Sequence, residues 1–324
     1  MNDLRRKMLL ASAALPMLRG MTASAATYPE KAIRMVVAFL PGNGTDIIAR
    51  VISQKLEGKL GQSVYVDNRP GAGGTIGTTN MARSEPDGYV LALATNATLI
   101  TSPLLLDKAP YQATQDFTPI AGIARTPLVV VAATKENSPK SFEEMVAKAR
   151  AGNSSFASSG VGTIGHLTSE VVVKRLNLQS VHIPYKGSPP ELTDVARGEI
   201  LFATDTAAAC LPFINGGQLR PLAVSGASRL PSLPKVPTLA EVGVKAVDLS
   251  VWWAVMAPRN LPDAVAQRLE EAVTGLASDA DLRQKMAQLE LEPMFMGREK
   301  LGAFIQTEYP FWRDFLSKTD IKLT

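Results

Sequence analysis

Short apolar runs alternate with helix-length segments along this chain, and that alternation constrains the fold more than any other sequence feature. The strand-like runs are 33–39, 63–66, 89–94, 128–133, 155–157, 181–185, 200–204 and 219–224. The segments between them that show helical spacing include 45–59, 141–150, 166–176, 189–197 and 206–215. Such alternation is typical of parallel sheets with helices on both faces. The sequence therefore predicts an α/β protein.

The length of the chain indicates two domains. At 324 residues it exceeds the size that one hydrophobic core usually supports. The segments 116–125 and 219–226 are the expected crossings between two sheets, because each is a strand-like run beside turn residues. The tail, 262–316, carries apolar residues at helical spacing and is expected to be mostly helical.

Three glycine-rich turns lie between a strand-like run and a helix-like segment, at 40–46, 68–75 and 158–166. None of them carries the lysine that the phosphate-binding loop of a nucleotide site needs. Glycine lets a backbone approach a ligand closely, and a helix N-terminus offers unpaired N–H groups at the positive end of its dipole. The turns therefore predict a protein that holds a small anion with backbone amides.

A dinucleotide site is one alternative, because residues 160–165 match the G-x-G-x-x-G pattern between a strand and a helix. That fingerprint also requires an acidic residue at the end of the next strand, to hold the ribose. Here the next strand, 181–185, is followed by Lys186 and Gly187. A single anionic group needs no ribose partner, so the sequence favours an anion site without a cofactor.

A hydrolase is a further alternative, because two serines and a histidine lie near the third turn. Ser158 and Ser159 are not in the G-x-S-x-G pattern of a nucleophile elbow, and His166 and His182 are the only histidines. His166, at a helix start, is equally well explained as a cap or a ligand contact. No metal-ligand spacing is present, and Cys210, the only cysteine, is expected to be buried. The sequence predicts no catalytic residues and no metal.

Two acidic residues lie where a ligand is expected. Asp46 follows the first glycine turn, where it can either cap the helix or contact the ligand. Asp205 ends an apolar strand and precedes an alanine-rich helix, which is where open α/β sheets bind ligands. Trp252 and Trp253 are expected in the core, with one indole reaching the cleft.

The pI of about 9.1 is not evidence of nucleic-acid binding. Residues 1–25 carry a net charge of +3 out of +4 for the whole chain, so the rest is nearly neutral and has no basic stripe. This segment has the three parts of a secretory signal: a basic start, a short apolar run and an Ala-Ser-Ala cleavage site. We therefore expect a signal peptide at residues 1–25 and, with no disulfide possible, a periplasmic protein.

Seven strings of residues, in order along the chain, resemble the Bug family, the periplasmic binding proteins of tripartite tricarboxylate transporters. They lie at 37–46, 68–74, 86–89, 158–167, 184–188, 219–225 and 237–241. The resemblance implies a two-lobed periplasmic-binding-protein (Venus-flytrap) fold, each lobe a mainly parallel sheet flanked by helices. We expect residues 26–124 and 222–324 in the first lobe and 125–221 in the second.

The resemblance also implies where the ligand binds. In the Bug family the first glycine turn and the Ser-Ser-Gly turn, one from each lobe, hold a carboxylate with backbone amides and bound water. The expected ligand-binding residues of the first lobe are Gly42, Asn43, Gly44, Thr45, Asp46, Thr95 and Asn96. Those of the second lobe are Ser158, Ser159, Gly160, Thr163, His166, Asp205 and Thr206.

The chain departs from the family pattern in the wall of the expected site. Asn43 stands where glycine is common, Leu99 where histidine is frequent, and Thr206 where asparagine is usual. Leu99, with Trp252 nearby in the resemblance, makes the wall less polar, and Asp205 should repel a second carboxylate. We therefore expect a mono- or dicarboxylate with an apolar or aromatic body, rather than a tricarboxylate.

The expected function is that of a binding protein without enzymatic activity. As a monomer, without nucleic-acid partners, it captures one small carboxylate between its lobes and delivers it to the permease of a tripartite tricarboxylate-type transporter. A sensor that presents the bound carboxylate to a membrane kinase is the alternative within the binding class. A hydrolase or oxidoreductase that uses the same cleft is less favoured, because the sequence offers it no base, nucleophile or cofactor site.

Overall fold

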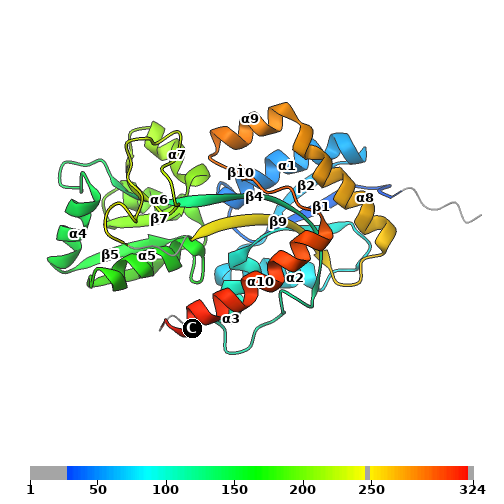
Figure 1. Ribbon diagram of the computed structural model, residues 1–324, viewed down its shortest axis with the longest axis horizontal. Helices are drawn as coiled ribbons and strands as arrows, with labels where there is room; N and C mark the ends of the chain where they lie inside the picture. The colour runs from blue at the N-terminus through cyan, green and yellow to red at the C-terminus, as the bar shows by residue number, and fades with distance from the viewer. Residues whose placement is uncertain (1–27, 245–248, 320–324) are drawn as a thin grey trace, which may run out of the picture.

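The computed structural model describes residues 28–244 and 249–319. In them the chain forms an α/β protein of two lobes, joined by strands that run through the middle of the molecule (Figure 1). The predicted fold class is confirmed. The signal peptide predicted at residues 1–25 lies outside the described residues.

The first lobe is built on a parallel sheet in the order β2-β1-β3. Its strands are β1 (Ile33–Val37), β2 (Val64–Asn68) and β3 (Val90–Thr95). Its helical segments are α1 (Gly44–Leu60), η1 (Ala72–Gly74), α2 (Thr75–Ala82), η2 (Ala97–Thr101) and α3 (Ser102–Leu104). Four of the five β1 residues are buried, which is why this strand is a continuous apolar run in the sequence.

The second lobe repeats this plan with a parallel sheet in the order β7-β5-β6. Its strands are β5 (Ser154–Ser158), β6 (Ser180–Pro184), β7 (Phe202–Thr206) and β8 (Leu219–Val224). Its helices are α4 (Phe142–Arg150), α5 (Ile164–Arg175), α6 (Ser188–Ala196) and α7 (Ala207–Asn215).

Two antiparallel strands connect the lobes. Strand β4 (Phe117–Ala133) pairs with β9 (Ser250–Pro258) over residues 117–127, and with β7 and β8 over residues 128–133. Strand β9 also pairs with β3, so it belongs to the first lobe. Figure 1 shows β4 and β9 side by side between the two halves of the molecule.

The return to the first lobe comes later than the expected crossing at 219–226. Strand β8 pairs with β4 in the second lobe, and Leu239 and Val244 pack in the same core cluster as Ala223. These contacts move the second expected lobe boundary from 222 to beyond residue 244. Sequence patterning does not identify β9 as a strand, although its residues 251–258 are all buried and form a continuous apolar run as β1 does, because such a run does not by itself distinguish a buried strand from a buried helix.

The C-terminal part is mostly helical, as predicted. It comprises α8 (Asp263–Thr274), η3 (Gly275–Ser278), α9 (Ala280–Gln288), β10 (Glu292–Pro293) and α10 (Arg298–Ser317). Helix α10 crosses from the first lobe to α5 of the second, and the two helices line a groove of about 480 Å³ (Figure 1). Every helix in the described part of the chain is too short or too polar to cross a membrane.

Close packing of α5 on β7 yields a stability prediction. A methyl group on Gly165 would overlap the carbonyl oxygen of Thr204, whereas Gly58, exposed in α1, has open space around it. We expect Gly165→Ala to destabilise the protein by about 1–3 kcal/mol, and the control Gly58→Ala to stabilise it by about 0.5–1 kcal/mol. Urea unfolding of both variants measures this; a stabilised Gly165→Ala would contradict the packing.

Candidate functional site

The turn between β1 and α1 is folded by its own side chains. Asn43 caps α1, since its Oδ1 accepts a hydrogen bond from the Thr45 amide at 2.9 Å. Gly42 has a φ of +83°, in the left-handed region that favours glycine. The indole N–H of Trp253 donates to Thr45 Oγ1 at 3.0 Å. Trp253 is therefore the indole that reaches the turn.

Asp46 fixes this turn, and Asn43 rather than Asp46 is the helix cap. Asp46 Oδ2 accepts hydrogen bonds from the Gly42 amide and Arg50 Nε, both at 2.9 Å, and Oδ1 accepts one from Asn68 Nδ2 at 2.9 Å. Burial raises the pKa of Asp46, but these hydrogen bonds outweigh burial and leave the pKa below its usual value. Both oxygens are thus satisfied within the first lobe.

The Ser-Ser-Gly turn between β5 and α5 is built similarly. Thr163 caps α5: its Oγ1 accepts from the His166 amide at 3.4 Å and donates to the Gly160 carbonyl at 2.8 Å. Gly160 and Gly162 have φ values of +150° and +80°. Ser158 is fully buried, and its hydroxyl contacts the Gly160 backbone. The following Ser159 is 7% exposed.

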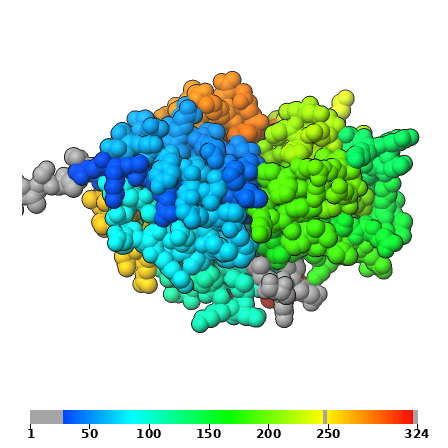
Figure 2. All heavy atoms as spheres, turned by 180° about the vertical axis from the view of Figure 1, so that it is seen from behind, coloured from blue at the N-terminus to red at the C-terminus, as the bar shows by residue number. Residues whose placement is uncertain are grey.

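The first turn lies directly against the second lobe. Gly44 is so close to Thr206 that a methyl group on Gly44 would overlap Thr206 Oγ1. Asn43 Nδ2 donates a hydrogen bond to Ser188 Oγ at 2.7 Å. In Figure 2 the blue and cyan atoms of the first lobe meet the green atoms of the second along a common boundary. The lobes are closed on each other.

A further contact between the lobes was missed by sequence reasoning, although it involves the glycine turn at 68–75. A methyl group on Gly73 would overlap the carbonyl oxygen of Val161 in the second lobe. Thr101 Oγ1, in η2, donates to the Gly162 carbonyl at 2.5 Å. The cluster of glycines is the sequence signal for this close approach, but the family resemblance gives the turn no place in the site.

Both helix starts leave backbone donors unused. Within the described residues, the amides of Gly44 and Asp46 in α1, and of Ile164 and Gly165 in α5, have no hydrogen-bond partner. The first amides of a helix lack partners inside the helix and lie at the positive end of its dipole. The protein therefore has two helix ends with unused amide donors, one in each lobe.

Three predicted site residues carry buried acceptor atoms. Asn96 Oδ1, Asp205 Oδ2 and Thr206 Oγ1 lack a hydrogen-bond partner among the described residues. The other ends are satisfied: Asn96 Nδ2 donates to the Ser250 carbonyl at 2.8 Å, and Asp205 Oδ1 accepts from the Thr206 amide at 2.6 Å. Because an unpaired buried polar atom costs free energy, Asn96 Oδ1 and Thr206 Oγ1 indicate a partner from a ligand or water, whereas Asp205 lies beside the protonated carboxyl group of Glu191.

Glu191, in the first turn of α6, is a buried acid that the sequence did not single out. It is 0% exposed beside Asp205, and neither of its carboxyl oxygens has a hydrogen-bond partner of normal geometry in the described chain. Burial, and then the charge of Asp205, raise the pKa of Glu191 well above its usual value. Burial also raises the pKa of Asp205. A glutamate in the first helical turn is normally solvated, so its sequence position gave no signal.

His166 forms a hydrogen bond with the Ser-Ser-Gly turn and is not the cap of α5. Its Nδ1 accepts a hydrogen bond from the Gly162 amide at 3.1 Å, and its ring stacks on His182 with centroids 3.8 Å apart. His182 Nε2 lies 2.7 Å from Ser158 Oγ. Burial, with a contribution from His166, lowers the pKa of His182 to about 3. So weak a base beside a fully buried serine is not a hydrolytic dyad.

Trp252 does not lie in the wall of the expected site, where the sequence analysis placed it. Its indole N–H donates to Glu308 in α10 at 2.9 Å, so this side chain faces α10 and not the turns. Thr95, at the end of β3, pairs with Trp253 across the ladder, and its Oγ1 accepts a bond from the Thr98 amide at 3.2 Å. Leu99 is 0% exposed. It belongs to the same hydrophobic core cluster as Trp252.

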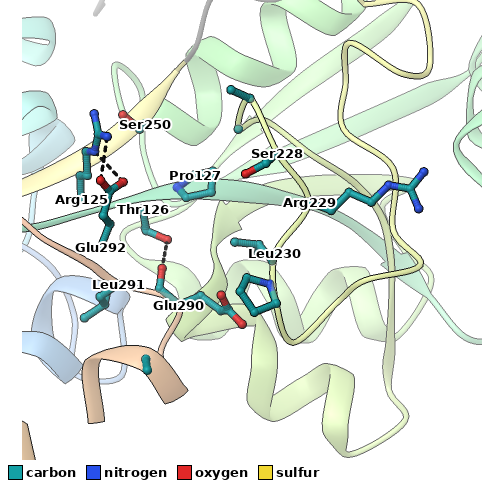
Figure 3. A pocket seen from close by; sticks show the side chains of 14 residues that line it. Arg125, Thr126, Pro127, Ser228, Arg229, Leu230, Ser250, Glu290, Leu291 and Glu292 are labelled. Carbon is teal, nitrogen blue, oxygen red and sulfur yellow. Dashed lines mark hydrogen bonds and ion pairs between the residues drawn. The ribbon is translucent and has the colours of Figure 1, made fainter. Parts of the chain in front are cut away.

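A separate cavity of about 470 Å³ lies where the crossing strands leave the first lobe (Figure 3). Arg125 and Glu292 form a bidentate ion pair at its edge, with distances of 2.8 and 2.9 Å. Thr126 donates to the Glu290 carbonyl at 2.6 Å. None of the predicted site residues lines this cavity. It is distinct from the two glycine turns.

Each lobe directs a glycine turn and a helix start at the other lobe. This arrangement is that of a solute-binding protein of the periplasmic type. The tripartite tricarboxylate transporter family receptor model matches residues 48–321, and the chain belongs to that family. The resemblance to the Bug proteins is thereby confirmed.

The chain is similar to named members of the family over nearly its full length. It is 35% identical over 303 residues to protein BugT of Bordetella pertussis, covering 93% of each chain. It matches the structure of the periplasmic binding protein BugD with a TM-score of 0.87 and 30% identity, covering 91% of this chain and 99% of that one. The same values hold for R. palustris Rpa4515, a structure with adipate.

The contacts of Asp46 predict a pH-dependent stability. A carboxylate whose pKa is lowered by folding stabilises the protein above its unfolded pKa, and this contribution is lost as the pH falls through the folded pKa. We expect Asp46→Asn to cost about 1–3 kcal/mol at neutral pH, because charged hydrogen bonds are lost. The difference from wild type should shrink below about pH 3.9. Urea unfolding across this range tests it, with exposed Asp107→Asn as control.

Because Gly44 contacts Thr206 of the second lobe, we predict that one methyl group added to Gly44 prevents the lobes from closing fully. We expect Gly44→Ala to have a larger radius of gyration in small-angle scattering than wild type in its compact form. The double variant Gly44→Ala/Thr206→Ala should recover the compact form, because it removes the overlapping Oγ1. Equal radii for wild type and Gly44→Ala would contradict the contact.

Proposed function

We propose that this chain is a periplasmic solute-binding protein that captures a small carboxylate between its lobes and delivers it to a tripartite tricarboxylate-type transporter. The observation that carries the proposal is the pair of helix N-termini, one in each lobe, with unused amides at Gly44, Asp46, Ile164 and Gly165. Partial positive charges at two helix ends suit one carboxylate group. The adipate of Rpa4515 supports this choice of ligand.

We propose further that the ligand carries a hydrogen-bond donor or an apolar body beyond its carboxylate, and that it is a mono- or dicarboxylate rather than a tricarboxylate. Asn96 Oδ1 is an acceptor that a ligand donor would satisfy, and the Thr206 hydroxyl can accept from or donate to the ligand. A further ionised carboxylate beside Asp205 would be buried against like charge, which is costly.

The remaining parts of the proposal concern partners and chemistry. We propose that the protein is a monomer that docks on a membrane permease and performs no reaction. The weakly basic His182 and the buried Ser158 support the absence of hydrolysis. We do not retain the sensor alternative, because the family description is that of a transporter receptor.

Calorimetric titration with adipate, citrate, benzoate and glutamine tests the ligand class. We expect adipate, benzoate or glutamine to bind more tightly than citrate, because citrate brings additional charges to the wall that contains Asp205. Ligands that bind only the folded protein also raise its melting temperature, which gives a second measurement. Tightest binding of citrate would refute the ligand class, and no binding of any carboxylate would refute the proposed function.

A further inference from the structure

The two histidines of the chain meet directly beneath the Ser-Ser-Gly turn. Their rings are stacked, with centroids 3.8 Å apart and planes 15° from parallel, although they come from α5 and β6. Phe156 continues the stack, with its ring centroid 4.9 Å from that of His182 and 6.2 Å from that of His166. Phe202 in turn packs on Phe156 at 5.5 Å. The pair is thus embedded in an aromatic column in the second lobe.

Each ring holds a different part of the turn. His166 Nδ1 accepts from the Gly162 amide at 3.1 Å. His182 Nε2 contacts Ser158 Oγ at 2.7 Å, and that oxygen also contacts the Gly160 amide at 3.3 Å and the Gly160 carbonyl at 3.0 Å. The backbone on both sides of Gly160 is therefore tied to the stacked pair.

The geometry requires His166 to be neutral. A nitrogen that accepts from the Gly162 amide carries no proton, so the ring proton is on Nε2, which lies 3.7 Å from Glu170 Oε1 on the next turn of α5. The rings contact Ser158, Phe156 and each other. Two charged imidazoles at stacking distance would repel each other. Burial, and then repulsion from His166, lower the pKa of His182 to about 3, so the His182 ring is neutral.

We propose that His166 and His182 are positioning residues that, as neutral stacked rings, hold the 158–162 turn in the conformation that binds the carboxylate. Protonation of His166 turns its Nδ1 from an acceptor into a donor facing the Gly162 amide, and so releases the turn. This inference rests on the proposed function, because it assigns the carboxylate to that turn.

Two amide variants separate the acceptor role from the bulk of the side chain. Asparagine places an acceptor near the Nδ1 position, and glutamine places one near the Nε2 position. With adipate as the probe, we expect His166→Gln to weaken binding about tenfold, as for one buried amide left unpaired. His166→Asn should remain within about threefold of wild type. His182→Gln, which keeps a polar group near Ser158, should bind better than His182→Leu.

The pH dependence gives a second readout that a merely structural role would not change. As the pH is lowered, wild type should lose affinity for adipate faster than His166→Asn does, and this comparison cancels the titration of adipate itself. Melting temperatures verify that all variants are folded. Equal affinities of His166→Gln and wild type, equal losses in both amide variants, or parallel pH profiles would each overturn the inference.

Amide NMR of the ligand-free protein separates this inference from the proposed function. His166→Gln should shift the Gly162 amide resonance and speed its hydrogen exchange, whereas His166→Asn should not. An unchanged Gly162 amide in His166→Gln would overturn the positioning role even if carboxylates bind. A changed amide in a protein that binds none of the carboxylates would refute the function and leave the coupling of His166 to the turn intact.

Discussion

Close approach of backbone between the lobes is the constraint on which the rest of this structure depends. Gly73 leaves no space for a Cβ atom against the Val161 carbonyl oxygen, and Gly44 leaves none as long as the Thr206 hydroxyl faces it. The start of α1 can reach the second lobe only because these contacts are so short. A larger residue at either position would separate the two helix ends that we propose to act on one ligand.

The arrangement of strands explains why these turns meet at all. The first turn follows the carboxyl end of β1, and the Ser-Ser-Gly turn follows the carboxyl end of β5, each the central strand of three parallel strands. In open α/β sheets, ligands bind at this edge because the connecting turns and helix starts gather there. The crossing strands β4 and β9 join the sheets so that the two edges face each other.

Strands, helices and turns that depend on neighbouring residues could be predicted from the sequence. Contacts between residues that are distant in sequence could not. The alternation of runs predicted most strands and helices, and the glycines at 42–44 and 160–162 predicted turns that carry helix starts. Strand β9 was not identified, because a continuous apolar run does not by itself distinguish a buried strand from a buried helix. Glu191, and the stacking of His166 on His182, depend on elements distant in sequence being brought together, which a single sequence does not record.

In the proposed site, helix dipoles rather than charged side chains bind the ligand. Such weak contacts suit a protein that has to release its ligand. The predicted site residues include no lysine or arginine, and the neighbouring titratable side chains favour neutral forms: burial lowers the pKa of His182 and raises that of Glu191. A helix end contributes about 0.3–2 kcal/mol to anion binding, far less than a buried ion pair costs to break. In the proposed function, affinity built from several such contributions would be lost in one step when the lobes separate, because the amides of α1 and α5 would then no longer act on the same carboxylate.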